Sequence, residues 1–224
     1  MRTITRAAVL ALWAAPAFAQ GRVIDEGSFL ITRNGAAAGR EAFRIVRMSG
    51  AGGDILRATA QIADGDRRIT PTLSTDSTGT PVSYEVAVRD QTGPVLHLQA
   101  RSVPGRMSVI EQTPHGESAK EYVVPKRLLL LDDDVFHQYY FAALGGPGAV
   151  QAIHPQGHGQ AQVTVERGAA DRVEVAGQQL AAVRYTVSAS AGDRAEVWVD
   201  SAGRLLRVAI PARGVVVQRE ELPR

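Results

Sequence analysis

Short runs in which apolar and polar residues alternate fill the chain from Gly27 onward, and turn signals rich in glycine, aspartate, asparagine or proline separate them. Side chains in a strand point alternately to opposite faces, so a period of two indicates strands with one buried face. Phe29 and Ile31 precede an Asn34-Gly35 turn signal, and Phe43 continues the alternation on the return. The pattern predicts an all-β fold that begins with an antiparallel pair.

The same pattern predicts a long antiparallel meander through the rest of the chain. Further strands are expected at residues 55–63, 68–75, 82–89, 95–103, 107–112, 119–124, 162–167, 172–175, 181–189, 195–199, 205–210 and 215–219. Asp200 to Gly203 is a hairpin connection between a strand that carries Trp198 and one that begins at Leu205. Because so long a meander curls rather than stays flat, we expect a strongly curved sheet, either a half-barrel or a barrel.

Charged residues inside these runs are expected on the solvated face of the sheet. Arg40, Glu41, Arg44 and Arg47 are examples in the first half, and Arg194, Glu196, Arg204 and Arg207 are examples in the second. Charges of this kind also discourage pairing between exposed sheet edges.

One segment, from Leu128 to Leu144, interrupts the meander. Asp132 is a candidate cap for a helix over residues 133–144, because Asp133 and Asp134 would then lie beside its positive end. The Gly145-Gly146-Pro147 sequence is expected to end this helix.

Aromatic residues are concentrated in the predicted helix. Of the twelve Phe, Trp and Tyr residues, Trp13 and Phe18 precede residue 20, and four of the other ten lie between Phe136 and Phe141. Burial of each ring gains about 2–3 kcal/mol, so the helix should lie against or inside the curved sheet as a plug or lid. The candidate ligand-binding residues are Phe136, Tyr139, Tyr140, Phe141 and Trp198, although core contact is the favoured interpretation of Trp198.

The first nineteen residues have the features of a secretory signal peptide. Arg2 and Arg6 precede an apolar run over residues 7–15 that is too short to span a bilayer, and an Ala17-Phe18-Ala19 cleavage site follows Pro16. We therefore expect cleavage after Ala19, a periplasmic location and a single β-rich domain over residues 20–224. The mature chain is not expected to span the membrane.

Charge and cysteine content limit the function classes. Removing Arg2 and Arg6 from the 25 Lys and Arg residues leaves 23, which balance 23 Asp and Glu residues. A net charge of zero argues against a nucleic-acid partner attracted by bulk charge. The chain has no cysteine, which excludes disulfides, thiol nucleophiles, thiolate metal sites and a lipid anchor on cysteine.

Histidine is the remaining candidate for a catalytic base or metal ligand. His154 and His158 have helical spacing, but Pro155, Gly157 and Gly159 prevent a helix there, so a solvated loop is the favoured interpretation. The sequence also lacks the G-x-S-x-G motif of a serine nucleophile. We therefore predict no catalytic residue, no metal site and no cofactor.

Three motifs carry a family resemblance. They are F-x-I followed by G-x-x-x-G-x-E-x-F-x-I from Phe29 to Ile45, L-D-D-D-V-F-H-Q-Y-Y from Leu131 to Tyr140, and A-E-V-W-V-D-x-x-G-R-L-L-R-V from Ala195 to Val208. The chain resembles uncharacterised exported β-rich proteins of Gram-negative bacteria that are known only as domains of unknown function. Its tryptophan strand and D-x-x-G turn are also similar, more distantly, to the periplasmic lipoprotein-carrier family. That resemblance implies a half-open barrel that holds acyl chains beneath a helical lid.

The leading functional hypothesis is a non-enzymatic periplasmic protein that binds a lipid, an acyl chain or another apolar molecule inside the curved sheet. A structural or protein-interaction module of the cell envelope is the first alternative, with an envelope protein as its partner. A metal-dependent hydrolase that uses His137, or His154 with His158, is the second.

Overall fold

The computed structural model describes residues 21–50, 52–124, 127–189, 192 and 194–224. The predicted signal peptide and its cleavage site lie outside these residues. The first half of the chain forms eight strands: β1 (Arg22–Arg33), β2 (Ala36–Gly50), β3 (Gly53–Asp64), β4 (Arg67–Asp76), β5 (Pro81–Asp90), β6 (Gly93–Val103), β7 (Arg106–Thr113) and β8 (Gly116–Val123). The second half forms seven: β9 (Leu128–Leu130), β10 (Gly148–His154), β11 (Gly159–Val175), β12 (Gln178–Ala189), β13 (Arg194–Val199), β14 (Leu205–Ile210) and β15 (Val215–Arg219).

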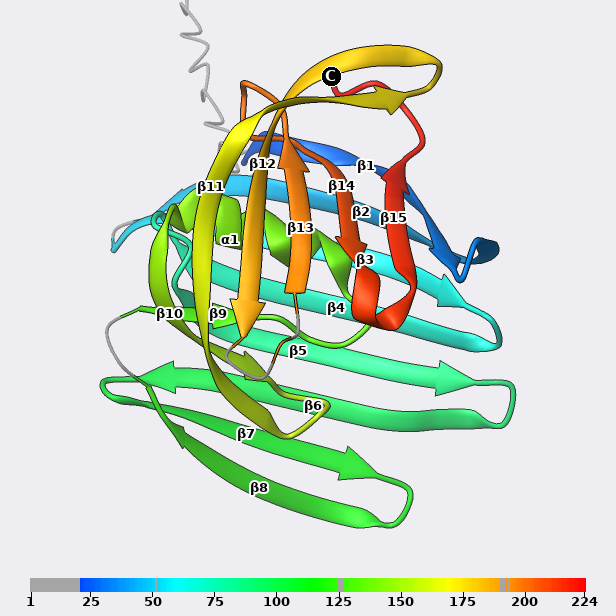
Figure 1. Cartoon of the computed structure of the whole chain (residues 1–224). Helices are drawn as coiled ribbons and strands as arrows, with labels where there is room; N and C mark the ends of the chain where they lie inside the picture. The colour runs from blue at the N-terminus through cyan, green and yellow to red at the C-terminus, as the bar shows by residue number, and fades with distance from the viewer. Residues whose placement is uncertain (1–20, 51, 125–126, 190–191, 193) are drawn as a thin grey trace, which may run out of the picture.

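The fifteen strands of the described residues all belong to one sheet, in the order β8-β7-β6-β5-β4-β3-β2-β1-β15-β14-β13-β12-β11-β10-β9. The predicted antiparallel meander is confirmed in both halves, and the pairing of β1 with β15 joins them. Two short strands were not predicted: β9, which pairs with β10 in parallel, and β10 itself. The two halves of the curved sheet face each other and enclose the helical segment (Figure 1).

The sheet does not close into a barrel, because its edge strands β8 and β9 do not pair with each other. Side chains nevertheless connect the β7–β8 hairpin to the β10–β11 hairpin. Lys120 Nζ donates to the His158 carbonyl at 2.7 Å, and Gln160 Nε2 donates to the Val123 carbonyl at 2.8 Å. The structure is therefore a curled open sheet, in which side-chain hydrogen bonds connect β8 at one edge to the β10–β11 hairpin near the other edge.

The inner face of this sheet forms the main core. Phe29, Ile31 and Ile45 are completely buried there, and the Phe29 and Phe43 rings stack at 4.7 Å. Glu41 corrects the sequence prediction, since it is also completely buried rather than solvated. It lies two residues before Phe43 in β2, so the period of two that buries Phe43 turns Glu41 to the same face.

A buried ion pair fastens the two halves together where β1 meets β15. Arg219 in β15 donates from Nη1 to Asp25 in β1 at 2.8 Å and to the Leu205 carbonyl of β14 at 2.9 Å. Asp25 in turn accepts the Leu205 backbone N–H at 2.9 Å. A Cβ at Gly27 would lie 2.8 Å from Arg219 Nη2, so a larger residue there would force this buried guanidinium group to shift. Burial raises the pKa of Asp25 above its usual 3.8, and the positive charge of Arg219 opposes that shift.

The helical segment begins later than the sequence predicted. A 3₁₀ turn, η1 (Phe136–Gln138), leads into α1 (Tyr139–Gly145), and Asp132 does not cap a helix. The aspartates instead pair with distant side chains, and Asp134 has a φ of 62°, which breaks the helical path before η1. The predicted end is confirmed, because Gly146 follows α1 with a φ of 69°. A second 3₁₀ turn, η2 (Pro211–Arg213), connects β14 to β15.

Candidate functional site

The start of the helical segment is held by Glu41. Its carboxylate accepts the backbone N–H groups of Phe136 at 2.8 Å and of His137 at 3.0 Å, and His137 Nδ1 lies 2.5 Å from Glu41 Oε1. Both side chains are completely buried, and the imidazole stacks on Phe43 with a centroid distance of 6.2 Å. One carboxylate therefore satisfies three donors and fixes η1 inside the curved sheet.

A second buried carboxylate, Asp132, holds the chain just before η1. It accepts hydrogen bonds from the Tyr84 hydroxyl at 2.8 Å, from the Gln156 backbone at 2.9 Å and from Gln156 Nε2 at 2.8 Å. Its own N–H donates to Gln138 Oε1 at 2.6 Å. Burial raises the pKa of Asp132 above 3.8, and the hydrogen bonds from Gln156 and Tyr84 oppose the shift. Burial likewise raises the pKa of Tyr84.

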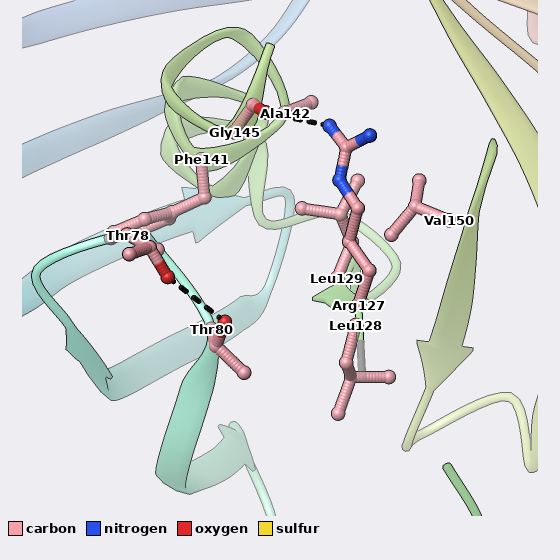
Figure 2. A pocket seen from close by; sticks show the side chains of 10 residues that line it. Thr78, Thr80, Arg127, Leu128, Leu129, Phe141, Ala142, Gly145 and Val150 are labelled. Carbon is pink, nitrogen blue, oxygen red and sulfur yellow. Dashed lines mark hydrogen bonds between the residues drawn. The ribbon is translucent and has the colours of Figure 1, made fainter. Parts of the chain in front are cut away.

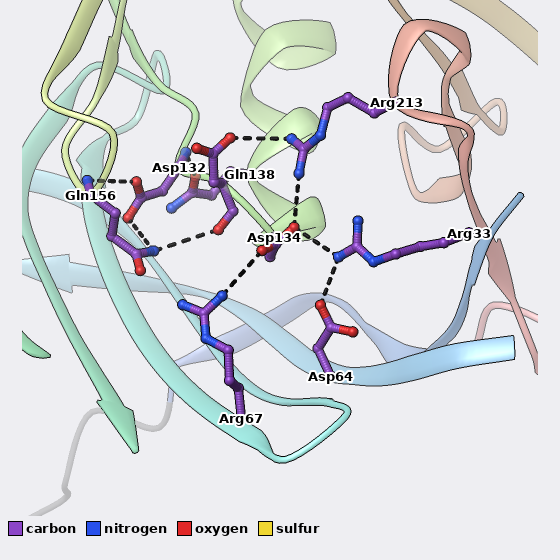
Figure 3. A network of polar contacts seen from close by, with 9 residues as sticks. Arg33, Asp64, Arg67, Asp132, Asp134, Gln138, Gln156 and Arg213 are labelled. Carbon is purple, nitrogen blue, oxygen red and sulfur yellow. Dashed lines mark hydrogen bonds and ion pairs between the residues drawn. The ribbon is translucent and has the colours of Figure 1, made fainter. Parts of the chain in front are cut away.

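Ion pairs at the partly buried Asp134 and the exposed Asp133 continue this anchoring towards the rim (Figure 3). Asp134 lies 2.8 Å from Arg33, 3.6 Å from Arg67 and 2.8 Å from Arg213. Asp133 also pairs with Arg213 at 3.1 Å. Asp133 and Asp134 thus share Arg213, whereas Asp132 bonds to Tyr84 and Gln156, and each of the three aspartates ties the helical segment to another part of the molecule.

The structure brings together four of the five predicted ligand-binding residues. Phe136, Tyr140 and Phe141 are buried in the main core, and the Tyr140 and Phe141 rings meet edge to face at 5.2 Å. Tyr139 is partly exposed and packs against the same core. The helical segment is therefore a plug between the two halves of the sheet, as its aromatic content predicts.

Trp198 lies apart from this group. It belongs to a smaller cluster on the outer face with Val173, Val175, Ala182, Leu206 and Ala209. Its Nε1 donates to Asp171 at 2.8 Å, which lowers the pKa of that carboxyl, and Arg207 lies 5.2 Å from its ring. The hairpin of β11 and β12 thus covers Trp198, in agreement with the favoured interpretation of core contact.

An apolar cavity of about 300 Å³ lies between the start of the plug and the inner face of β10–β14. Its apolar lining consists of Leu131, Tyr139, Ala161, Val163, Val187, Ala189, Ala195 and Ile210. Asp133, His154, Gln160, Arg194 and Arg213 lie at its polar edge. We call this space the Tyr139 cavity. Its edge therefore carries two arginines and one aspartate.

Two other cavities border α1. One, of about 340 Å³, lies between Tyr140, Ala143 and Leu144 of α1 and residues of β11–β13, including Val183, Tyr185 and Val199. We call it the Tyr140 cavity. The other, of about 320 Å³, is shown in Figure 2 and lies between α1, β9 and the turn at Thr78 to Thr80. Arg127 extends into it and donates to the Gly145 carbonyl at 2.6 Å, so this third space is more polar.

His97, His137 and His158 each pair with a glutamate. His137 is completely buried, so its ring is closed to a substrate from solvent. His154 ends β10 and His158 lies in the turn before β11, which confirms that no helix carries this pair. His158 pairs with Glu111 rather than with His154. Within the described ranges, no group of three or more acidic or histidine side chains has the arrangement of a metal site.

Sequence reasoning missed two groups of site residues. The buried carboxylate of Glu41 was detectable, because it shares the inward register of Phe43 and Ile45. The cavity residues Ala161, Val163, Ala189 and Ala195 carry no distinguishing chemistry, and only the packing of β11–β13 brings them together. Among the described residues, no helix is long and apolar enough to cross a bilayer.

The protein is thus a curled antiparallel sheet, open between its edges, with an aromatic plug inside. The chain belongs to the family DUF6134, described as a domain of unknown function, whose model matches residues 83–220. Its structure is similar to the crystal structure of a beta-barrel-like protein of domain of unknown function DUF1849 from Brucella abortus. The TM-score is 0.56 at 10% identity, and the match covers 90% of this chain and 97% of the other. At this identity the likeness shows the fold alone. Comparison with curated proteins gives no match.

The resemblance to β-rich domains of unknown function is thereby confirmed.

Proposed function

We propose that this protein is a periplasmic binding protein without catalytic activity, and that it holds an apolar ligand such as an acyl chain in the Tyr139 cavity. The observation that carries the proposal is the apolar lining of a 300 Å³ space inside the curved sheet. Ligand cavities of this size are commonly lined by hydrophobic and aromatic side chains with a few polar groups at the opening. Tyr139, which is partly exposed, contributes an aromatic wall.

The hydrogen bonds around the Tyr139 cavity also support binding. Glu41 and Asp132 hold the segment that forms one wall, and the strands β10–β14 form the opposite wall. Because η1 and the chain before it are held in place before the ligand arrives, binding costs less conformational entropy. The predicted signal peptide supports the periplasmic location, and the burial of His137 supports a role without catalysis.

Filling the Tyr139 cavity should weaken binding of an apolar ligand. Ala189 is partly buried at the cavity wall, and a tryptophan there would occupy the space that the ligand needs. We expect the Ala189→Trp variant to bind the apolar fluorophore N-phenyl-1-naphthylamine at least about tenfold more weakly than the wild type, measured by fluorescence titration. Ser188→Trp is the matched control, because the neighbouring side chain points to the opposite face of β12. Equal affinity of both variants and the wild type would refute the proposed site.

A further inference from the structure

The Tyr139 and Tyr140 cavities lie next to each other along the inner face of β11 and β12. We call each inward-facing residue pair across these two strands a row. In the register of β11 with β12, Val163 faces Ala189, Val165 faces Val187, and Arg167 faces Tyr185. The first two rows carry residues of the Tyr139 cavity, and the third carries residues of the Tyr140 cavity. Strand β13 adds one residue to the lining of each cavity: Ala195, opposite Val187, lines the Tyr139 cavity. Val199, opposite Val183, lines the Tyr140 cavity. The two cavities are therefore successive spaces along the same inner face of β12.

The wall between the cavities is formed by the plug. Tyr139 borders one cavity and Tyr140 borders the other, although the two residues are neighbours at the start of α1. The helix has only seven residues, and no side chain caps its start. Helices of this length depend on tertiary packing for their stability, so a small shift of α1 away from β12 needs no unfolding of the sheet.

Partly exposed apolar side chains lie at both ends of the path between β12 and α1. Tyr139 and Ala189 at one end, and Ala143 and Tyr185 at the other, pack against the main core without being fully buried. A ligand that covers both pairs would remove more apolar surface from water than one that fills a single cavity.

We propose that the ligand is a linear hydrocarbon chain that lies along β12 from Ala189 to Val183, beneath α1, and joins the two cavities. This inference rests on the proposed function, because it extends the Tyr139 cavity into a channel. The strand rises about 3.3 Å per residue, so the path is about 20 Å long. A compact ring system fits one cavity and cannot follow such a path, whereas a long unbranched chain can.

Chain length and a block in the Tyr140 cavity test the channel. Octanoate, dodecanoate and hexadecanoate are titrated against the full mature protein by displacement of N-phenyl-1-naphthylamine, with adamantane carboxylate as the compact probe. We expect hexadecanoate to bind at least about tenfold more tightly than octanoate and than adamantane carboxylate. Ala143→Phe should remove that gain and leave octanoate affinity within about twofold, because octanoate fits within the Tyr139 cavity alone.

Val183→Phe provides a second block from the sheet side, and Ala181→Phe is the control, since this exposed residue lies outside both cavities in the same strand. Far-ultraviolet circular dichroism verifies that each variant folds. Unchanged hexadecanoate affinity in both folded block variants would overturn the channel, as would equal affinities of adamantane carboxylate and hexadecanoate for the wild type. If none of the four probes binds the wild type, the proposed function itself fails together with the channel.

Discussion

Replacing Arg219 by methionine is expected to lower the free energy of unfolding by about 3–5 kcal/mol, because it leaves the Asp25 carboxylate buried without its partner. The guanidinium group is 1% exposed and the carboxylate 0% exposed, so water cannot compensate for the loss. The substitution also removes the donor to the Leu205 carbonyl and the contact of Arg219 with the Phe43 ring at 5.6 Å. Urea unfolding followed by circular dichroism measures the change.

The effect of Arg219→Met should depend on pH. Burial already raises the pKa of Asp25 above 3.8 in the folded protein, and removal of the positive charge raises it further. A carboxyl whose folded pKa is raised stabilises the fold below its unfolded pKa, and this stability is lost as pH rises through the folded value. The variant should therefore lose more stability at about pH 7 than at about pH 4.

Two further variants isolate the buried pair. Asp25→Asn combined with Arg219→Met should recover part of the loss, because no charge then remains unpaired. Arg40→Met removes an ion pair with Glu220 whose arginine is 68% exposed, and should cost at most about 1 kcal/mol. An Arg219→Met variant as stable as Arg40→Met would show that the buried pair does not hold β1 to β15.

Substitution of Glu41 by alanine is expected to destabilise the protein by about 3–5 kcal/mol, since it leaves three buried donors without their acceptor. The backbone N–H groups of Phe136 and His137 and the His137 ring would all lose their partner. Because these donors fix η1, the near-ultraviolet circular dichroism of the plug tyrosines should also weaken. Urea unfolding gives the magnitude, and the near-ultraviolet signal shows where the change occurs.

Glu85→Ala is the matched control for Glu41→Ala. Glu85 also pairs with a histidine, His97, but its side chain is 56% exposed, so its removal should cost less than about 1 kcal/mol. If Glu41→Ala and Glu85→Ala have equal stability and the same near-ultraviolet spectrum, Glu41 does not anchor the plug.

The strand pattern could be predicted from the sequence because the alternation is local. Phe29 and Ile31, the Asn34-Gly35 turn and the hairpin at Asp200 each identify their elements within a few residues. The short strand β9 has three residues that are all buried, so it shows no alternation and was missed. The pairing of β1 with β15 joins residues nearly 200 positions apart, and no local signal specifies it.

The site was predictable only in its aromatic part. Clustered rings between Phe136 and Phe141 indicate burial wherever they lie, and the structure places them in the plug. The three aspartates misled the prediction, because residues that favour a helix start also form long-range pairs, as Asp132 does with Tyr84 and Gln156. The Tyr139 cavity depends on how far α1 lies from β12, which no residue type encodes.

Native mass spectrometry of the wild-type protein isolated from the periplasm of expressing cells tests whether the Tyr139 cavity holds an apolar ligand. We expect the wild type to carry a bound apolar molecule, released by organic solvent, and Ala189→Trp isolated in the same way to have the bare protein mass. A bare wild-type mass that stays unchanged after incubation with hexadecanoate would show that the protein does not bind such a ligand.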